Sequence, residues 1–269
     1  MRIWDVHTHL AGAPGSPRQR AEKMLRSADR LGVERFFLHM GTIFVADPTP
    51  DALRLANKEV LEAVKADPER IRGLVYVNPK YPEASLAEFE RCVVNGPMVG
   101  VKIWVAVRCS DPRLDPIIKR AAEQKAPLII QHTWLKIGGN PRIVGAGNSP
   151  GESTPTDVAI LARRHPDVPI VCVHVGGDWE LGIRSVSSIP NVMIEVSGSY
   201  PTDGFVEMAV REVGAERVMF GSDMPGRSLA SQLAKVQGAQ ISESDKELIL
   251  GGNLRRLLAP IYRQKGLKL

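Results

Sequence analysis

The chain is poor in cysteine, and this shortage excludes some protein classes. It contains three cysteines in 269 residues, Cys92, Cys109 and Cys172, and no two of them stand in C-x-x-C spacing. An odd number of cysteines without this spacing argues against a disulfide framework and against a cysteine zinc site. We therefore expect a protein of the reducing cytoplasm.

Long apolar runs are also absent. No stretch of the sequence approaches the roughly 18 consecutive apolar residues of a membrane-spanning helix. The first residues, MRIWDVHTH, lack the basic start and apolar stretch that are typical of a signal peptide. These observations predict a soluble, unprocessed chain with no membrane partner.

Charge of one sign does not dominate either. The chain has 35 Lys and Arg against 30 Asp and Glu, a net charge of +5, and no run of five or more basic residues. Nucleic-acid-binding proteins usually concentrate basic residues on one face, so we expect no nucleic-acid partner. The expected partner is a small-molecule substrate, and a homo-oligomer is compatible with the sequence.

Short β-branched runs alternate with longer amphipathic segments along the whole chain. This alternation is typical of parallel strands covered by helices, and it predicts eight strands. The expected strands are 3–7, 33–39, 74–78, 98–105, 128–132, 170–174, 192–197 and 218–223. The expected helices include 18–31, 51–65, 84–94, 115–125, 156–164, 205–213 and 243–258.

The domain organisation follows from the spacing of these units. No Pro/Gly/Ser-rich linker divides the chain, so the eight units predict an α/β fold, a single (β/α)₈ barrel over residues 1–269. A doubly wound open sheet is the alternative, but no G-x-G-x-x-G follows the first strand and no P-loop is present. The Gly- and Pro-rich segment 136–155 is expected to be a binding loop or a surface insertion.

Histidine placement carries the first functional signal. Five of the six histidines lie at or just beyond the carboxyl end of an expected strand, where the strands of a barrel meet at one mouth. Imidazole is the commonest side-chain ligand for zinc and similar ions. The five residues are His7, His9, His39, His132 and His174.

Strand alternation tests which of these side chains share a face. His7 and His9 are two residues apart, so both project to the same side of the first strand. The same alternation directs His132, His174 and Asp223 inward. A buried group of imidazoles around a carboxylate is costly unless a cation neutralises it. The pattern predicts a divalent metal site, with Zn²⁺ first and Mn²⁺ or another ion as alternatives.

Five motifs carry a resemblance to a known family. They are DVHTHL at 5–10, IIQH at 129–132, VHVGG at 173–177, FGSDMP at 220–225 and ILGGNLRRLL at 249–258. The chain resembles the amidohydrolase superfamily, and within it the branch that includes aminocarboxymuconate-semialdehyde decarboxylase. The resemblance implies that His7, His9 and His132 bind a divalent metal, with Asp223 as a further ligand and proton acceptor. It implies that His174 polarises the substrate or holds a second metal.

Three further residues are candidates for contacts at the mouth. Alternation places Lys102 and Trp104 inward on the fourth expected strand. In two-metal members of the superfamily a carboxylated lysine bridges the ions, and Lys102 could take that part. The other interpretations of Lys102 are an ion pair with Glu195 or a substrate contact. We favour these interpretations, and we therefore expect one metal ion and not two. Trp104, and Arg227 just after Asp223, are candidate substrate contacts.

The reaction is the last inference. A metal with an open coordination position lowers the pKa of bound water to about 7, and Asp223 beside it can take the proton. The leading prediction is a hydrolase that cleaves an amide, ester or lactone, with Asp223 and His174 as catalytic residues. The alternative is a metal-dependent, non-oxidative decarboxylase of a small carboxylic acid. A deoxyribonuclease and a non-catalytic metal-binding barrel rank below both.

Overall fold

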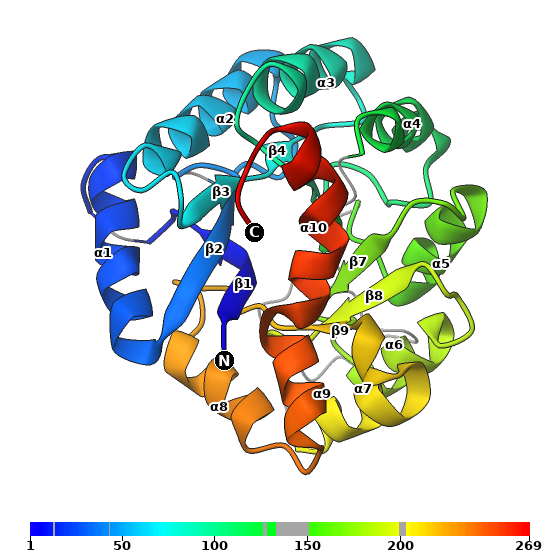
Figure 1. Ribbon diagram of the computed structural model, residues 1–269. Helices are drawn as coiled ribbons and strands as arrows, with labels where there is room; N and C mark the ends of the chain where they lie inside the picture. The colour runs from blue at the N-terminus through cyan, green and yellow to red at the C-terminus, as the bar shows by residue number, and fades with distance from the viewer. Residues whose placement is uncertain (13, 43, 126–127, 133–150, 199–202) are drawn as a thin grey trace.

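Strands and helices alternate along the chain, and the helices form an outer layer around the strands (Figure 1). The computed structural model describes residues 1–12, 14–42, 44–125, 128–132, 151–198 and 203–269, with the backbone alone for 128–132. The strands are β1 Ile3–His9, β2 Val33–His39, β3 Ile71–Gly73, β4 Val75–Tyr76, β5 Gly100–Ile103, β6 Leu128–His132, β7 Ile170–Val173, β8 Val192–Glu195 and β9 Val218–Met219.

The helices lie outside the strands in the same chain order. They are α1 Pro17–Leu31, α2 Pro50–Val64, α3 Pro82–Phe89, α4 Asp115–Glu123, α5 Pro155–Arg164, α6 Trp179–Val186, α7 Phe205–Val213, α8 Leu229–Gln237, α9 Glu243–Glu247 and α10 Asn253–Gln264. Several begin at the caps that the sequence contains. Ser16 and Thr154, for example, each accept a backbone hydrogen bond in a capping box at the start of α1 and α5.

All strand pairs are parallel and join neighbours in the sequence. The two sheets have the order β1-β2-β3 and β4-β5-β6-β7-β8-β9. This parallel arrangement with helices between strands confirms the α/β prediction. In such a sheet the carboxyl ends of all strands lie on one edge, which is where the histidines were expected.

The third expected strand, 74–78, differs from the structure. Regular strand begins earlier, at Ile71, and is interrupted at Leu74. The Leu74 amide donates to Leu38 O at 2.9 Å, on the β2 side, and the Val77 amide donates to Lys102 O at 3.2 Å, on the β5 side. The Val99 amide also donates to Gly73 O at 3.0 Å, so the segment bonds to β2 along one side and to the strand that contains β5 along the other. Residue composition does not signal where its regular strand is interrupted.

The last expected strand, 218–223, is regular only over Val218–Met219. Beyond it the backbone turns toward β1. The Val6 amide donates to Phe220 O at 3.2 Å, and the Asp223 amide donates to His7 O at 2.8 Å. These bonds to β1 replace regular strand pairing, and they bring Asp223 beside His7.

Two helices, α6 and α8, are not among those named from the sequence, and the final helix differs from its prediction. Asp178 precedes α6, but its side chain makes no capping hydrogen bond. The expected helix 243–258 is broken at Gly251 and then continues to Gln264. A Cβ on Gly251 would lie 2.6 Å from Arg2 O, so this break allows close packing against the start of β1.

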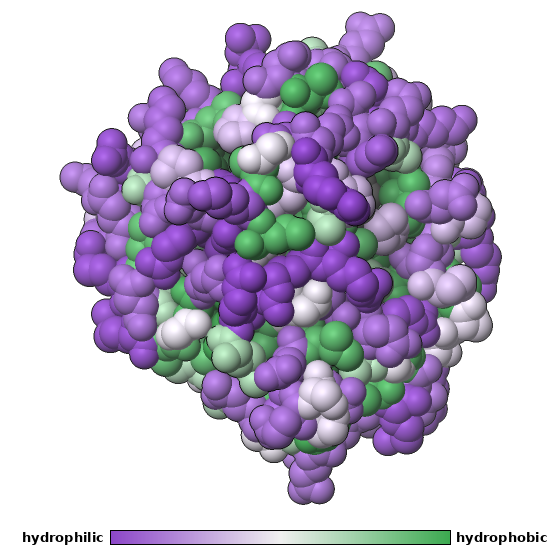
Figure 2. Space-filling view, in the orientation of Figure 1, coloured by the Kyte–Doolittle hydropathy of each residue, from purple (hydrophilic) through white to green (hydrophobic). Residues whose placement is uncertain are grey.

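Apolar side chains of the strands and of the inner helix faces form one large buried cluster. The face that carries both termini is mostly hydrophilic, with small separate apolar patches (Figure 2). Among the described helices, none combines the length and apolar character that crossing a membrane requires.

A buried amide ties α2 to β4. Asn57 Nδ2 donates to Tyr76 O at 3.0 Å and to Glu88 Oε2 at 3.1 Å, and Asn57 Oδ1 accepts from the Tyr76 amide at 2.8 Å. The side chain of Asn57 thus satisfies both backbone groups of Tyr76. Because these groups are buried, they would lose their partners without it.

Replacing Asn57 by alanine should lower the free energy of unfolding by about 2–4 kcal/mol, because it leaves buried polar groups unpaired. Urea denaturation measures this change. Asn95→Ala is the matched control, since Asn95 is exposed and donates only to Glu90 O. Its effect should stay within about 0.5 kcal/mol. Equal losses in the two variants would contradict the role given to Asn57.

Candidate metal centre

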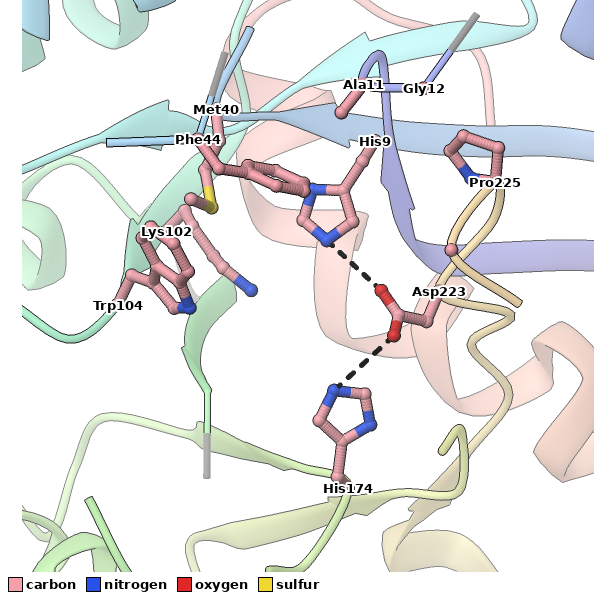
Figure 3. A pocket seen from close by; sticks show the side chains of 11 residues that line it. His9, Ala11, Gly12, Met40, Phe44, Lys102, Trp104, His174, Asp223 and Pro225 are labelled. Atoms are coloured by element: carbon pink, nitrogen blue, oxygen red, sulfur yellow. Dashed lines mark ion pairs between the residues drawn. The ribbon is translucent and has the colours of Figure 1, made fainter. Parts of the chain in front are cut away.

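Four of the predicted site residues converge at the carboxyl ends of the strands. His7 and His9 project from β1, His174 follows β7 and Asp223 follows β9. His7 Nε2 lies 3.0 Å from His9 Nε2. Asp223 Oδ1 lies 3.6 Å from His7 Nε2 and 3.3 Å from His9 Nε2. Asp223 Oδ2 lies 3.8 Å from His174 Nε2, opposite His9 (Figure 3).

The backbone is left-handed at two of these residues. His174 has φ 64° and Asp223 has φ 55°. Non-glycine residues rarely adopt this conformation, which costs about 1–3 kcal/mol at each position. His174 comes directly after β7 and Asp223 lies four residues after β9, and both side chains line the pocket.

Glu195 and Ser197 contact the His7 and His174 side of the cluster. The Glu195 carboxylate accepts from the Ser197 amide at 2.8 Å, from Ser197 Oγ at 2.9 Å and from the His174 amide at 3.2 Å. Its Oε2 also lies 3.5 Å from His7 Nδ1. Sequence reasoning proposed Glu195 as a partner of Lys102 and missed this role, although alternation on 192–197 signals that Glu195 faces inward.

These contacts decide where the ring protons lie. His174 Nδ1 is 2.9 Å from Ser197 O, and a carbonyl can only accept, so Nδ1 carries the proton and Nε2 bears a lone pair. The Glu195 carboxylate likewise favours a proton on His7 Nδ1. The Nε2 lone pairs of His7 and His174 then face the Asp223 carboxylate. Electron-rich atoms that converge in this way suit a divalent cation, and the donor set is that of such a site.

Burial and charge act on the ionisation of the cluster. Burial lowers the pKa of His9, which favours the neutral ring that a metal ligand requires. For Asp223, burial acts to raise the pKa, but positive charge on the His7, His9 and His174 rings lowers it well below its usual range, and a bound cation would act in the same direction. The carboxylate is therefore the stable form at neutral pH.

His39 joins the cluster as well. Its ring lies 5.1 Å from the ring of His7 and 4.3 Å from that of His9, and ligand atoms of the three residues lie within 4.8 Å of one another. The sequence analysis placed His39 at a strand end but did not include it among the predicted metal ligands. Its position at the strand end was the signal that could have indicated its place in the cluster. The predicted ligand His132 ends β6, where it pairs with Val173, and its side chain lies outside the described residues, as does segment 133–150.

A pocket of about 330 Å³ adjoins the cluster. Lys102 and Trp104 line it together with His9, His174 and Asp223, as strand alternation predicted. Phe44 adds a second aromatic wall, its ring 5.6 Å from that of Trp104 (Figure 3). The remaining candidate, Arg227, lies with its Nε 3.6 Å from Asp223 Oδ2. The pocket can hold a small organic molecule against the cluster.

Comparison with known proteins gives a consistent group. A family model described as amidohydrolase matches residues 4–259. The chain is 22% identical over 290 residues to a gamma-resorcylate decarboxylase of Polaromonas sp., covering 88% of this chain and 86% of the relative. It is 26% identical over 246 residues to a 2-amino-3-carboxymuconate-6-semialdehyde decarboxylase of Dictyostelium discoideum, covering 77% of this chain and 67% of the relative.

Solved structures show the same fold. The 2,6-dihydroxybenzoate decarboxylase from Rhizobium aligns with a TM-score of 0.74 at 18% identity, over 96% of this chain and 99% of that chain. A dihydroxybenzoic acid decarboxylase from Polaromonas sp., solved with bound manganese, aligns with a TM-score of 0.74 at 19% identity, over 96% of this chain and 97% of that chain.

These relatives correct the leading functional prediction. Both curated relatives are decarboxylases, so the prediction of a hydrolase that cleaves an amide, ester or lactone is wrong. The resemblance stated from the motifs is confirmed, because the family match spans nearly the whole chain and includes His7, His9, His174 and Asp223. The chain is an enzyme of the amidohydrolase family.

Proposed function

We propose that this chain is a metal-dependent decarboxylase that releases CO₂ from a small carboxylic acid without oxidation or hydrolysis. The observation that carries the proposal is the convergence of His7, His9, His174 and Asp223 beside a pocket that also contains the Lys102 amine. A cation at the cluster and an ammonium in the pocket both favour binding of an acid. The decarboxylases among the relatives support the same reaction.

We also propose that residues 1–269 form one domain whose strands close into a (β/α)₈ barrel. Two groups of backbone bonds support closure. The segment around Leu74 bonds to β2 on one side and to β5 on the other, and the segment after β9 bonds to β1. The likeness to the Rhizobium decarboxylase over 96% of this chain also supports it.

His7, His9 and Asp223 would hold the metal ion, and His132 stays a predicted further ligand. Nitrogen and carboxylate donors suit both Zn²⁺ and Mn²⁺. We propose one ion and place Mn²⁺ first, because manganese is bound in the Polaromonas structure. When bound, such an ion supplies a Lewis acid that holds and polarises the oxygens of the substrate.

The reaction needs one proton for each CO₂ released. The carbon–carboxylate bond breaks, its electron pair stays on the carbon that lost CO₂, and that carbon takes a proton. Asp223 and His174 both border the pocket, so either side chain can deliver this proton to the carbon. Arg227, 3.6 Å from Asp223 Oδ2, helps to fix the orientation of that carboxylate.

Isotope labelling tests the proposal. The protein loaded with Mn²⁺ or Zn²⁺ is incubated with a panel of small carboxylic acids that includes hydroxybenzoates. We expect one CO₂ for each acid consumed, deuterium in the decarboxylated organic product made in D₂O, and no ¹⁸O in that organic product when it is made in H₂¹⁸O. Protein stripped with a chelator is the control and should regain activity when Mn²⁺ is restored. Incorporation of ¹⁸O into the product, or a lack of CO₂ from every acid, would contradict decarboxylation.

A further inference from the structure

Lys102 is an ionisable residue whose buried amine lacks a bonding partner among the described residues. Its side chain belongs to β5 and the residue is 1% exposed. Its Nζ atom has no hydrogen-bond partner among the described residues. Transfer of an ammonium into the protein interior costs several kcal/mol unless an anion pairs with it. A fold that keeps this amine buried therefore points to a missing anionic partner.

The nearby carboxylates of the protein do not supply that partner. Glu195 is held by the Ser197 amide, Ser197 Oγ and the His174 amide. Asp223 faces the imidazoles. Burial lowers the pKa of Lys102 to about 7, and the charges of Asp223 and Glu195 oppose this shift without a direct contact. An additional anion close to Nζ would offset the rest of the cost of burying a protonated Lys102.

The pocket is where such an anion can reach Lys102. Figure 3 shows the amine end of Lys102 pointing away from β5 into the space in front of His9, Asp223 and His174. The rings of Phe44 and Trp104 stand beside it, 5.6 Å apart between centroids. Aromatic walls next to an ammonium favour a flat, conjugated ligand that carries a negative oxygen group.

We propose that Lys102 binds a second anionic oxygen group of the substrate, distinct from the carboxylate that is lost, so that the pocket selects planar acids with two such groups. This inference rests on the proposed decarboxylation for the identity of the leaving group. The second group is a carboxylate or an ionised hydroxyl on the same conjugated system.

Catalysis explains why Lys102 should bind the group that stays. The leaving carboxylate becomes neutral CO₂, so an ammonium bound to it would stabilise the reactant more than the transition state. A second oxygen group on the conjugated system keeps its charge, or gains charge as the electron pair of the broken bond delocalises. An ammonium at that oxygen stabilises the transition state at least as well as the reactant.

The inference is tested by varying both residue 102 and the number of carboxylates on the ligand. The dissociation constants of benzoate and of the three benzenedicarboxylates are measured by calorimetry on Mn²⁺-loaded wild type, Lys102→Met and Lys102→Arg. We expect Lys102→Met to weaken the tightest dicarboxylate by about 10–100-fold, the usual effect of losing a charge-assisted bond, and benzoate by less than about threefold. Lys102→Arg should restore part of the preference. Lys58→Met, at an exposed residue outside the pocket, should change neither value.

Folding and metal content are checked on the same samples. Lys102→Met should melt no lower than wild type, because it replaces a buried unpaired charge with an apolar chain of similar length. It should also keep its full metal content, whereas loss of metal would overturn the inference in favour of a metal-bridging lysine. Equal weakening of benzoate and dicarboxylates, or a wild type that prefers no dicarboxylate, would overturn it as well.

The outcome is separable from that of the proposed reaction. A Lys102-dependent preference for two-anion ligands in a protein that releases no CO₂ would uphold the binding role of Lys102 and reject decarboxylation. Release of CO₂ without that preference would uphold the reaction and reject the role given to Lys102.

Discussion

Replacing both His7 and His9 by alanine should abolish binding of the divalent metal and reduce CO₂ release by about 10³-fold or more. The Nε2 atoms of His7 and His9 lie 3.0 Å apart and face the same oxygen of Asp223. No single neighbouring side chain can replace both of these metal ligands. The expected loss is large because a metal ion contributes several kcal/mol of charge stabilisation, and each 1.4 kcal/mol is a tenfold change in rate. Metal analysis of the purified variant measures the first effect directly.

The matched control for this pair is His165→Ala. His165 lies after α5, where its Nε2 is 2.8 Å from Asp115 Oδ1, and it has no place in the cluster. This variant should keep wild-type metal content and activity. A His7/His9 double variant that retains stoichiometric metal would refute the assignment of the centre, and circular dichroism should show that the variant is folded.

Asp223→Asn should lower the rate of decarboxylation by about 10²–10⁴-fold, the usual contribution of a positioned acid–base group. The amide keeps the size of the side chain but cannot carry a proton to the substrate. Part of the metal should remain bound, since His7 and His9 are unchanged. Single-turnover kinetics with metal content measured on the same sample separates the two effects.

Asp167→Asn, at an exposed residue outside the pocket, is the corresponding control and should behave as wild type. An Asp223→Asn enzyme with full metal content and an unchanged rate would show that another group transfers the proton. His174, whose Nε2 lies 3.8 Å from Asp223 Oδ2, would then be the residue to test.

Local rules were sufficient for most of the site. The alternation of side chains along a strand placed His7 and His9 on one face, and the common edge of parallel strand ends brought His174 and Asp223 to them. The same alternation placed Lys102 and Trp104 in the pocket. These predictions needed only approximate strand positions, since Asp223 reaches the cluster although regular strand ends at Met219.

Other features depend on contacts that no local pattern contains. The role of Glu195 depends on the position of Ser197 and of the His7 and His174 rings, and the bounds of the strand around Leu74 depend on its backbone bonds to β2 and β5. The reaction was mispredicted for a chemical reason. His7, His9 and Asp223 would hold the same ion in a hydrolase and in a decarboxylase, so the ligands alone do not distinguish whether water or the leaving carboxylate reacts.

The left-handed backbone at His174 and Asp223 sets a limit for anyone who engineers this protein. Glycine would relieve the conformational cost at either position, so a library selected only for heat resistance should enrich glycine there. Each such variant would gain thermostability while losing a side chain of the candidate centre. Stabilisation campaigns should therefore hold these two positions constant and seek their gains on the helical exterior.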